Sequence, residues 1–245
     1  MDAAPARETA KAAVASGPAL NFDRSSDLYK LATDSINQSD PLALYNGWLA
    51  TSACVSVQNT RSQHEQLAAS DRSRRALAAQ ELLRRCNGFF NNDRAANSGL
   101  LKRFADRLAA DKTRYFSGVT PGDMSQAHVD AMLAAQDWQT LLAMQYQLLP
   151  GARASLGIQA GSAQEMLLAL AWLQAGCDLG RDCSDRSIMY IARCADSGRC
   201  PGSIEAAFSE GLASAQSEEV QQFRKRIVQA FLARDGRFFR VANGP

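Results

Sequence analysis

The chain has 245 residues, of which 46% are apolar and 21% charged, and its formal net charge is +2. This length and apolar content exclude a disordered chain and allow a sizeable buried core. The balanced charge argues against nucleic-acid binding, which needs many clustered phosphate contacts, and no run approaches the roughly 20 apolar residues of a membrane span.

The first 20 residues are rich in alanine, proline and charge, and they contain no continuous apolar stretch of the kind found in a signal peptide. We expect residues 1–20 to form a flexible tail and residues 21–245 to form a single helical domain. Because the cysteine usage points to export, we also expect that a leader was removed and that Met1 is an added start codon.

Helical spacing of apolar residues begins after Ser25. Asp40 and Pro41 suit the N-cap and first position of the next helix. The stretch 61–86 has a helical pattern that is interrupted near Ser70. Two more helices are then expected, over about 94–111 and from Thr120 to about Ala135.

Asp137 is expected to cap a helix through Leu149, and Pro150 and Gly151 are expected to break the chain after it. Ser162 begins a capping box before a strongly apolar helix. The remaining elements are helices near 185–194, 203–213 and 217–234, followed by a short extended piece over 237–241.

No alternating pattern elsewhere is long enough for a sheet. The predicted fold class is therefore all-α, either a multi-helix bundle or an irregular α-solenoid of helical hairpins, stapled by disulfides.

The chain has six cysteines: Cys54, Cys86, Cys177, Cys183, Cys194 and Cys200. Six cysteines can form three disulfides in fifteen ways. The last four cysteines form two Cys-x5-Cys units, and each unit contains a glycine and ends a helical run. A partner about ten residues further along a helix would lie roughly 15 Å away, too far for a disulfide. The favoured pairs are therefore Cys177–Cys183 and Cys194–Cys200, which leaves Cys54–Cys86 to tie two neighbouring helices.

Disulfides would place the protein in the periplasm or outside the cell. One alternative is a cytosolic protein with six ordinary thiols. Another is a zinc site, although five intervening residues match structural zinc ligand spacing poorly.

Two regions carry a resemblance to known proteins. The segments SSDLYKLATDSINQSDPLALYNGWLATSAC (25–54) and LLRRCNGFF (82–90) resemble the opening helical hairpins of TPR/Sel1-like exported proteins of bacteria. The segments ALAWLQAGCDLGRDCS (169–184) and IARCADSGRC (191–200) resemble a C-terminal cysteine-paired region of uncharacterised proteobacterial secreted proteins. The resemblance implies a helical-repeat fold and a periplasmic or secreted location, and it transfers no catalytic residues.

The sequence predicts no catalytic, cofactor-binding or metal-binding residue. The two histidines, His64 and His128, both lie in polar stretches of predicted helices and are expected at the surface. The common hydrolase, dinucleotide and phosphate-loop motifs do not occur.

A basic cluster is a candidate contact region, and it comprises Arg72, Arg74, Arg75, Arg84 and Arg85. Several of these side chains could line one side of a helix and meet an acidic partner. The alternative is a solvated helix face with Asp71 and Glu81 as neighbours.

We therefore expect an exported helical protein-binding or scaffold protein of the bacterial envelope, with another protein as its partner and its oligomeric state open. One alternative is an all-helical envelope hydrolase acting on peptidoglycan, which would need a buried carboxylic acid of raised pKa in a deep cleft. The others are an immunity-type protein that neutralises a toxin and a purely structural or storage protein.

Overall fold

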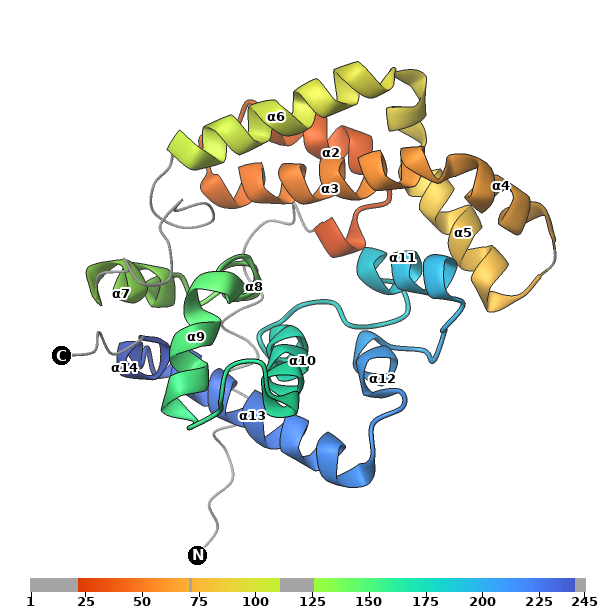
Figure 1. Cartoon of the computed structure of the whole chain (residues 1–245). Coiled ribbons are helices and arrows are strands. Elements are labelled where there is room, and N and C mark those ends of the chain that lie inside the picture. Colours follow the sequence, from red (N-terminus) through yellow and green to blue (C-terminus); the bar gives the residue numbers. More distant parts are fainter. Residues whose placement is uncertain (1–21, 71, 111–125, 241–245) are drawn as a thin grey trace, which may run out of the picture. The chain divides into compact units, whose positions relative to one another are not determined.

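The computed structural model describes residues 22–70, 72–110 and 126–240. In these ranges the chain forms 13 α-helices and two short 3-10 helices and no strand, apart from one isolated bridge between Ser184 and Ser203 (Figure 1). The predicted disulfide-stapled all-α fold is thereby confirmed. The expected tail over 1–20 and the expected N-cap at Thr120 lie outside the described residues.

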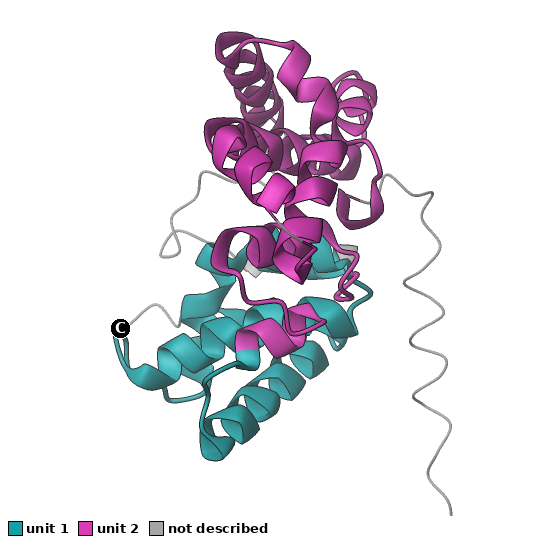
Figure 2. Cartoon of the chain, turned by 90° about the vertical axis from the view of Figure 1, so that its right-hand side faces the viewer, with its two compact units in different colours: residues 1–18, 112–181, 209–245 teal, residues 19–111, 182–208 magenta. Residues whose placement is uncertain are grey.

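The region predicted as one domain divides into two compact units whose segments alternate along the chain (Figure 2). Unit 1 comprises residues 1–18, 112–181 and 209–245, and unit 2 comprises residues 19–111 and 182–208. Such a division has no local signature, because each unit is assembled from segments far apart in the sequence.

Unit 2 contains two 3-10 helices and seven α-helices among the described residues: η1 (Phe22–Arg24), α2 (Leu28–Ser35), α3 (Pro41–Asn59), α4 (Arg61–Ser70), α5 (Arg74–Arg85), η2 (Asn87–Asn91), α6 (Arg94–Ala110), α11 (Ile188–Ser197) and, at its border, α12 (Ile204–Ser209). Helix α3 packs against α2 and α6, whereas α5 packs against both α4 and α11.

Local capping sets several helix starts in unit 2. The Asp40 carboxylate accepts hydrogen bonds from two N–H groups of the first turn of α3, with Pro41 at the first helical position. The Ser73 side chain likewise accepts from the N–H of Ala76 at the start of α5. These contacts satisfy donors that a helix start leaves without partners, and they confirm the predicted start at Pro41 and the break after Ser70.

Unit 1 contains α7 (Gln126–Ala135), α8 (Trp138–Ala143), α9 (Gln145–Ser155), α10 (Ala163–Asp178), α13 (Ser214–Leu232) and α14 (Gly236–Phe239). Its core is centred on Trp172 in α10, whose indole N–H donates to the Leu141 carbonyl at 2.8 Å. Phe239 packs edge-on against both Trp172 and Phe231. This aromatic cluster joins α10, α13 and α14.

Two sequence predictions in unit 1 are wrong. Pro150 lies inside α9 rather than ending a helix, and the break occurs instead at Met144, between α8 and α9. The segment expected to be extended over 237–241 forms the helical turn α14 through Phe239. In both cases burial outweighs local preference, because α9 and α14 pack against each other and bury Phe239.

Gly151 is the point of closest approach between α9 and α14. A Cβ built at this position would overlap the carbonyl group of Phe239, which is backbone and has no side-chain freedom to move aside. We expect Gly151→Ala to lower the free energy of unfolding by about 1–3 kcal/mol or more, measured by urea denaturation. Gly99→Ala in α6 is the control, because a Cβ there meets no atom within 4 Å. It should be neutral or stabilising by up to about 1 kcal/mol, and equal losses at both positions would contradict the packing account.

No helix in the described ranges is both long enough and apolar enough to cross a membrane.

Candidate functional site

A groove of about 530 Å³ runs along unit 2 between α5 and α11. The two helices are antiparallel, because Arg75 in the first turn of α5 contacts Ala195 at the end of α11, and Arg85 in its last turn contacts Arg186, just before α11. We call this feature the α5–α11 groove. Its lining comprises Arg74, Leu77, Ala78, Glu81, Arg85, Asp185, Arg186, Tyr190, Ile191, Cys194 and Gly202.

The apolar part of the α5–α11 groove is open to solvent at Leu77. This side chain is 53% exposed, whereas its neighbours Ala78, Tyr190 and Ile191 are buried. The Tyr190 hydroxyl is held by the N–H of Gly202 at 3.0 Å, so the aromatic ring is fixed in place. An exposed leucine above a fixed apolar wall is a surface that a second apolar side chain can cover.

Arg85, in the last turn of α5, lines one end of the α5–α11 groove. It is only 7% exposed, and each guanidinium nitrogen donates to a different group: Nε to the Glu81 carboxylate at 2.8 Å, Nη1 to the Asp23 carbonyl at 3.2 Å and Nη2 to the Arg186 carbonyl at 3.0 Å. One side chain therefore links α5, η1 and the segment that leads into α11. Its partners make Arg85 a structural group rather than a contact for a ligand.

Glu81 is held between two arginines. Arg84 donates to both carboxylate oxygens at 2.7 Å, and Arg85 adds a third hydrogen bond. The hydrogen bonds from Arg84, more than any other cause, lower the pKa of Glu81 to about 2 from its ordinary value of 4.5, against an opposing effect of burial. Glu81 is therefore ionised at neutral pH.

This lowered pKa predicts a specific loss of stability in acid. A carboxylate with a depressed folded-state pKa contributes fully above its ordinary pKa of 4.5, and the contribution is lost as the pH falls toward about 2. Glu81→Gln should remove about 1–2 kcal/mol of that dependence, after allowing for solvent screening at a side chain that is 32% exposed. The free energy of unfolding is measured at intervals from about pH 6 to about pH 2. It should fall less steeply with decreasing pH in Glu81→Gln than in the wild type. Glu218→Gln, at an exposed position of α13, should keep the wild-type slope, and a matching change there would contradict the assignment.

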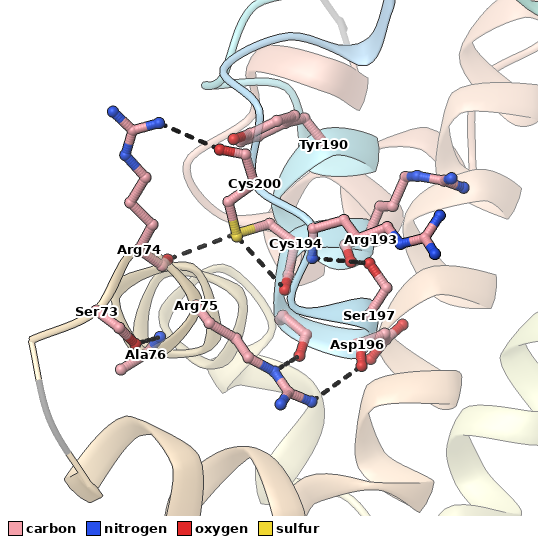
Figure 3. Close-up of a disulfide and its surroundings, with 12 residues drawn as sticks. Ser73, Arg74, Arg75, Ala76, Tyr190, Arg193, Cys194, Asp196, Ser197 and Cys200 are labelled. Carbon is pink, nitrogen blue, oxygen red and sulfur yellow. Dashed lines mark hydrogen bonds between the residues drawn. A yellow bond between two sulfur atoms is a disulfide. The ribbon is translucent and has the colours of Figure 1, made fainter. Parts of the chain in front are cut away.

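The other end of the α5–α11 groove is bounded by the loop that the Cys194–Cys200 disulfide closes (Figure 3). Gly198 ends α11 in the left-handed conformation (φ 73°), where its N–H bonds to the Cys194 carbonyl. Arg75 donates to the carbonyls of Ala195 and Asp196, both at 3.0 Å. These carbonyls lie at a helix C-terminus, where a cation is favoured and acceptors lack helical partners.

Arg74 also reaches this loop, donating to the Cys200 carbonyl at 3.2 Å, and its own carbonyl lies 3.5 Å from the Cys194 sulfur (Figure 3). The start of α5 and the disulfide loop are therefore fastened to each other.

The structure separates the five arginines that the sequence grouped together. Arg74 and Arg75 hold the disulfide loop, whereas Arg84 and Arg85 hold Glu81 at the opposite end of α5. Arg72 is exposed before the first turn of α5. Two members of the cluster, Arg74 and Arg85, line the α5–α11 groove together with other residues of α5. The opposite wall could not be foreseen, because its residues, from Asp185 to Gly202, come about a hundred positions later.

The prediction that His64 lies at the surface is wrong. His64 is 4% exposed; its Nε2 lies 3.0 Å from the Asp196 carboxylate, and its Nδ1 lies 3.1 Å from both the hydroxyl and the carbonyl oxygen of Thr60. Because a carboxylate only accepts, the hydrogen bond to Asp196 uses the tautomer with the proton on Nε2, in which Nδ1 accepts from the Thr60 hydroxyl. His64 is buried against Asp196, which lies 132 residues away in the sequence, and no local pattern can reveal such a contact. His128 lies on α7.

A hydroxyl, an imidazole and a carboxylate are thus arranged in the sequence Thr60, His64, Asp196. Catalytic triads of acyl-transfer enzymes have their groups in the same order. None of the three lines the α5–α11 groove, and the Thr60 hydroxyl also lies 3.4 Å from the carbonyls of Ser56 and Val57, which compete for its proton. The array connects α4 to the end of α11 and supports the same loop that Arg75 holds. We assign it a structural role.

All six cysteines are disulfide-bonded. Cys54 pairs with Cys86 across a Cα separation of 5.3 Å, and Cys194 pairs with Cys200 across 4.8 Å, as the helical spacing predicted. Cys177 and Cys183 are also disulfide-bonded, as expected. Cys54–Cys86 joins the middle of α3 to the residue that ends α5 and so stabilises the helix that carries one wall of the groove.

The hydrolase alternative requires a carboxylic acid that keeps its proton near neutral pH. Glu81 is the glutamate that lines the α5–α11 groove, and its pKa is lowered. The pKa of Glu165 is also lowered, first by the N–H of Gly161 and then by Arg153. Neither glutamate has the raised pKa that the alternative needs. Among the described residues, no group of three or more His, Cys, Asp or Glu side chains is arranged to hold a metal ion.

Comparison with known proteins gives no relative: no family model, curated protein or solved structure matches the chain.

Proposed function

We propose that this protein is an exported helical binding protein of the bacterial envelope and that it holds a segment of a partner protein in the α5–α11 groove. The observation that carries the proposal is Leu77, a large apolar side chain left 53% exposed above the buried wall of Ala78 and Ile191. Covering this side chain would remove apolar surface from water, which is the main driving force for association.

The disulfides support the exported location. Structural disulfides persist in the periplasm and outside the cell and are rare where glutathione keeps thiols reduced. The structure has three cysteine pairs at disulfide distance, and one of them closes the loop at the end of the groove. A periplasmic or secreted protein with a rigid, disulfide-braced groove is suited to binding.

Site-specific photocrosslinking tests this proposal. A photoreactive amino acid is placed at Leu77 in the native host, and at Met166 as the control, because Met166 in α10 is similarly exposed (56%) but lies in the other unit. We expect a discrete crosslinked partner from position 77 and not from position 166. The identified partner, once purified, should bind Leu77→Glu at least about tenfold more weakly than the wild type, whereas Met166→Glu should bind normally.

The proposal fails if both positions give the same crosslinking pattern. It also fails if the purified partner binds Leu77→Glu and the wild type equally well, because Leu77 would then lie outside the contact.

A further inference from the structure

We infer that the partner segment is acidic as well as apolar, with a carboxylate that faces Arg74 and a bulky apolar side chain that covers Leu77. This inference rests on the proposed function and names the chemistry of the partner. It follows from how charge is distributed along the α5–α11 groove.

The groove follows α5, which has 12 residues and is therefore about 18 Å long. Arg74 lies at one end and Arg85 at the other, with Leu77 and Ala78 between them. A bound segment consequently meets the charged and apolar parts of the lining in a fixed order.

At the Arg85 end, the charges already have partners or opposite neighbours. Glu81 and Arg85 are bonded to each other, and the exposed Arg186 follows Asp185 directly in the sequence. This end offers a ligand little unbalanced charge.

The Arg74 end is cationic. Arg74 is the charged residue that lines the groove at this end, and the five positions from Asp71 to Arg75 hold three arginines and one acidic residue. The Asp196 carboxylate, on the loop that Arg75 holds, already accepts a hydrogen bond from His64. Arg74 is exposed and uses one of its five N–H donors on the Cys200 carbonyl, so its guanidinium can also bind an incoming carboxylate.

The spacing of Arg74 and Leu77 on α5 sets the spacing expected between the acidic and the apolar residue of the partner segment. Residues three apart on a helix are neighbours, with about 5–6 Å between their Cβ atoms. The matching partner segment therefore carries Asp or Glu close to Leu, Phe or another bulky apolar residue. A helical segment would place them three or four positions apart, and an extended segment two positions apart.

Random peptide display tests the inference. A library of peptides of about 12 residues, long enough to span the groove as a helix, is selected on the oxidised full-length protein. The library is counter-selected on Leu77→Glu. We expect the enriched sequences to combine an acidic and a bulky apolar residue at the spacing given above.

The consensus peptide is then synthesised, and its affinity is measured by fluorescence anisotropy. Arg74→Glu should weaken binding at least about tenfold, and a peptide with lysine in place of its acidic residue should bind Arg74→Glu better than it binds the wild type. Arg103→Glu, an exposed position of α6, makes the same change in net charge and should leave the affinity unchanged.

Two results would overturn the inference while leaving the proposed function intact. One is a consensus that contains apolar residues without enrichment of acidic ones, and the other is equal binding by Arg74→Glu and Arg103→Glu. If no sequence is enriched over the Leu77→Glu counter-selection, the inference fails as well. Crosslinking at Leu77 then decides separately whether the proposed function fails with it.

Discussion

Arg85→Ala is expected to lower the free energy of unfolding by about 3–5 kcal/mol, whereas Arg84→Ala should cost less than about 1 kcal/mol. Both arginines bind Glu81, but Arg85 is 7% exposed, whereas the side chain of Arg84 is 56% exposed. Removing Arg85 takes the donor from the buried carbonyl of Asp23 and breaks a second, partly buried hydrogen bond to the carbonyl of Arg186.

Urea denaturation of the two variants measures this difference. The pair is matched because each change deletes the same side chain from adjacent positions and breaks a contact with the same carboxylate. Equal losses would show that the hydrogen bonds of Arg85 to η1 and to the start of α11 do not hold unit 2 together.

Removal of the Cys54–Cys86 disulfide should have an effect of similar size. In the loop-entropy account, a bridge across 32 positions contributes about 3–4 kcal/mol, and one across six positions contributes about 2–2.5 kcal/mol. The double variant Cys54→Ala/Cys86→Ala should therefore unfold at lower urea concentration than Cys194→Ala/Cys200→Ala. Equal midpoints would contradict the assignment of the larger contribution to the longer loop.

The two disulfide variants should differ in the opposite way in binding. Cys194 lines the α5–α11 groove and Cys200 anchors Arg74, so loss of this bridge frees the loop that orders the cationic end. Peptide affinity measured under native conditions should consequently fall more in Cys194→Ala/Cys200→Ala, although this variant is the more stable of the two.

Local signals in the sequence predicted much of the fold. Asp40 with Pro41, Ser162 with its downstream glutamate, and the apolar spacing of each helix all act within a few residues of one another, and the structure has helix starts at these points. The Cys194–Cys200 disulfide was also predictable, because helix length limits which cysteines can meet, and Cys54–Cys86 followed by elimination. Short-range geometry was therefore sufficient for the all-α fold class.

The groove could not be predicted in the same way. Arg85 contacts Arg186, and His64 contacts Asp196, across separations of 101 and 132 residues, and no local pattern encodes such pairs. Pro150 shows the same principle in reverse, since tertiary packing of α9 on α14 outweighs the local tendency of proline to end a helix. A cluster of arginines read as one surface is consequently divided between the two ends of α5.

The pairing of all six cysteines underlies the fold, the proposed export of the protein and the wall of the groove. Intact mass measured with and without reductant, on protein isolated from its native host, tests this pairing most directly. The account predicts a gain of about 6 Da on reduction, two hydrogens for each of three bridges, and no alkylation without reductant. An unchanged mass, or thiols that alkylate before reduction, would contradict it.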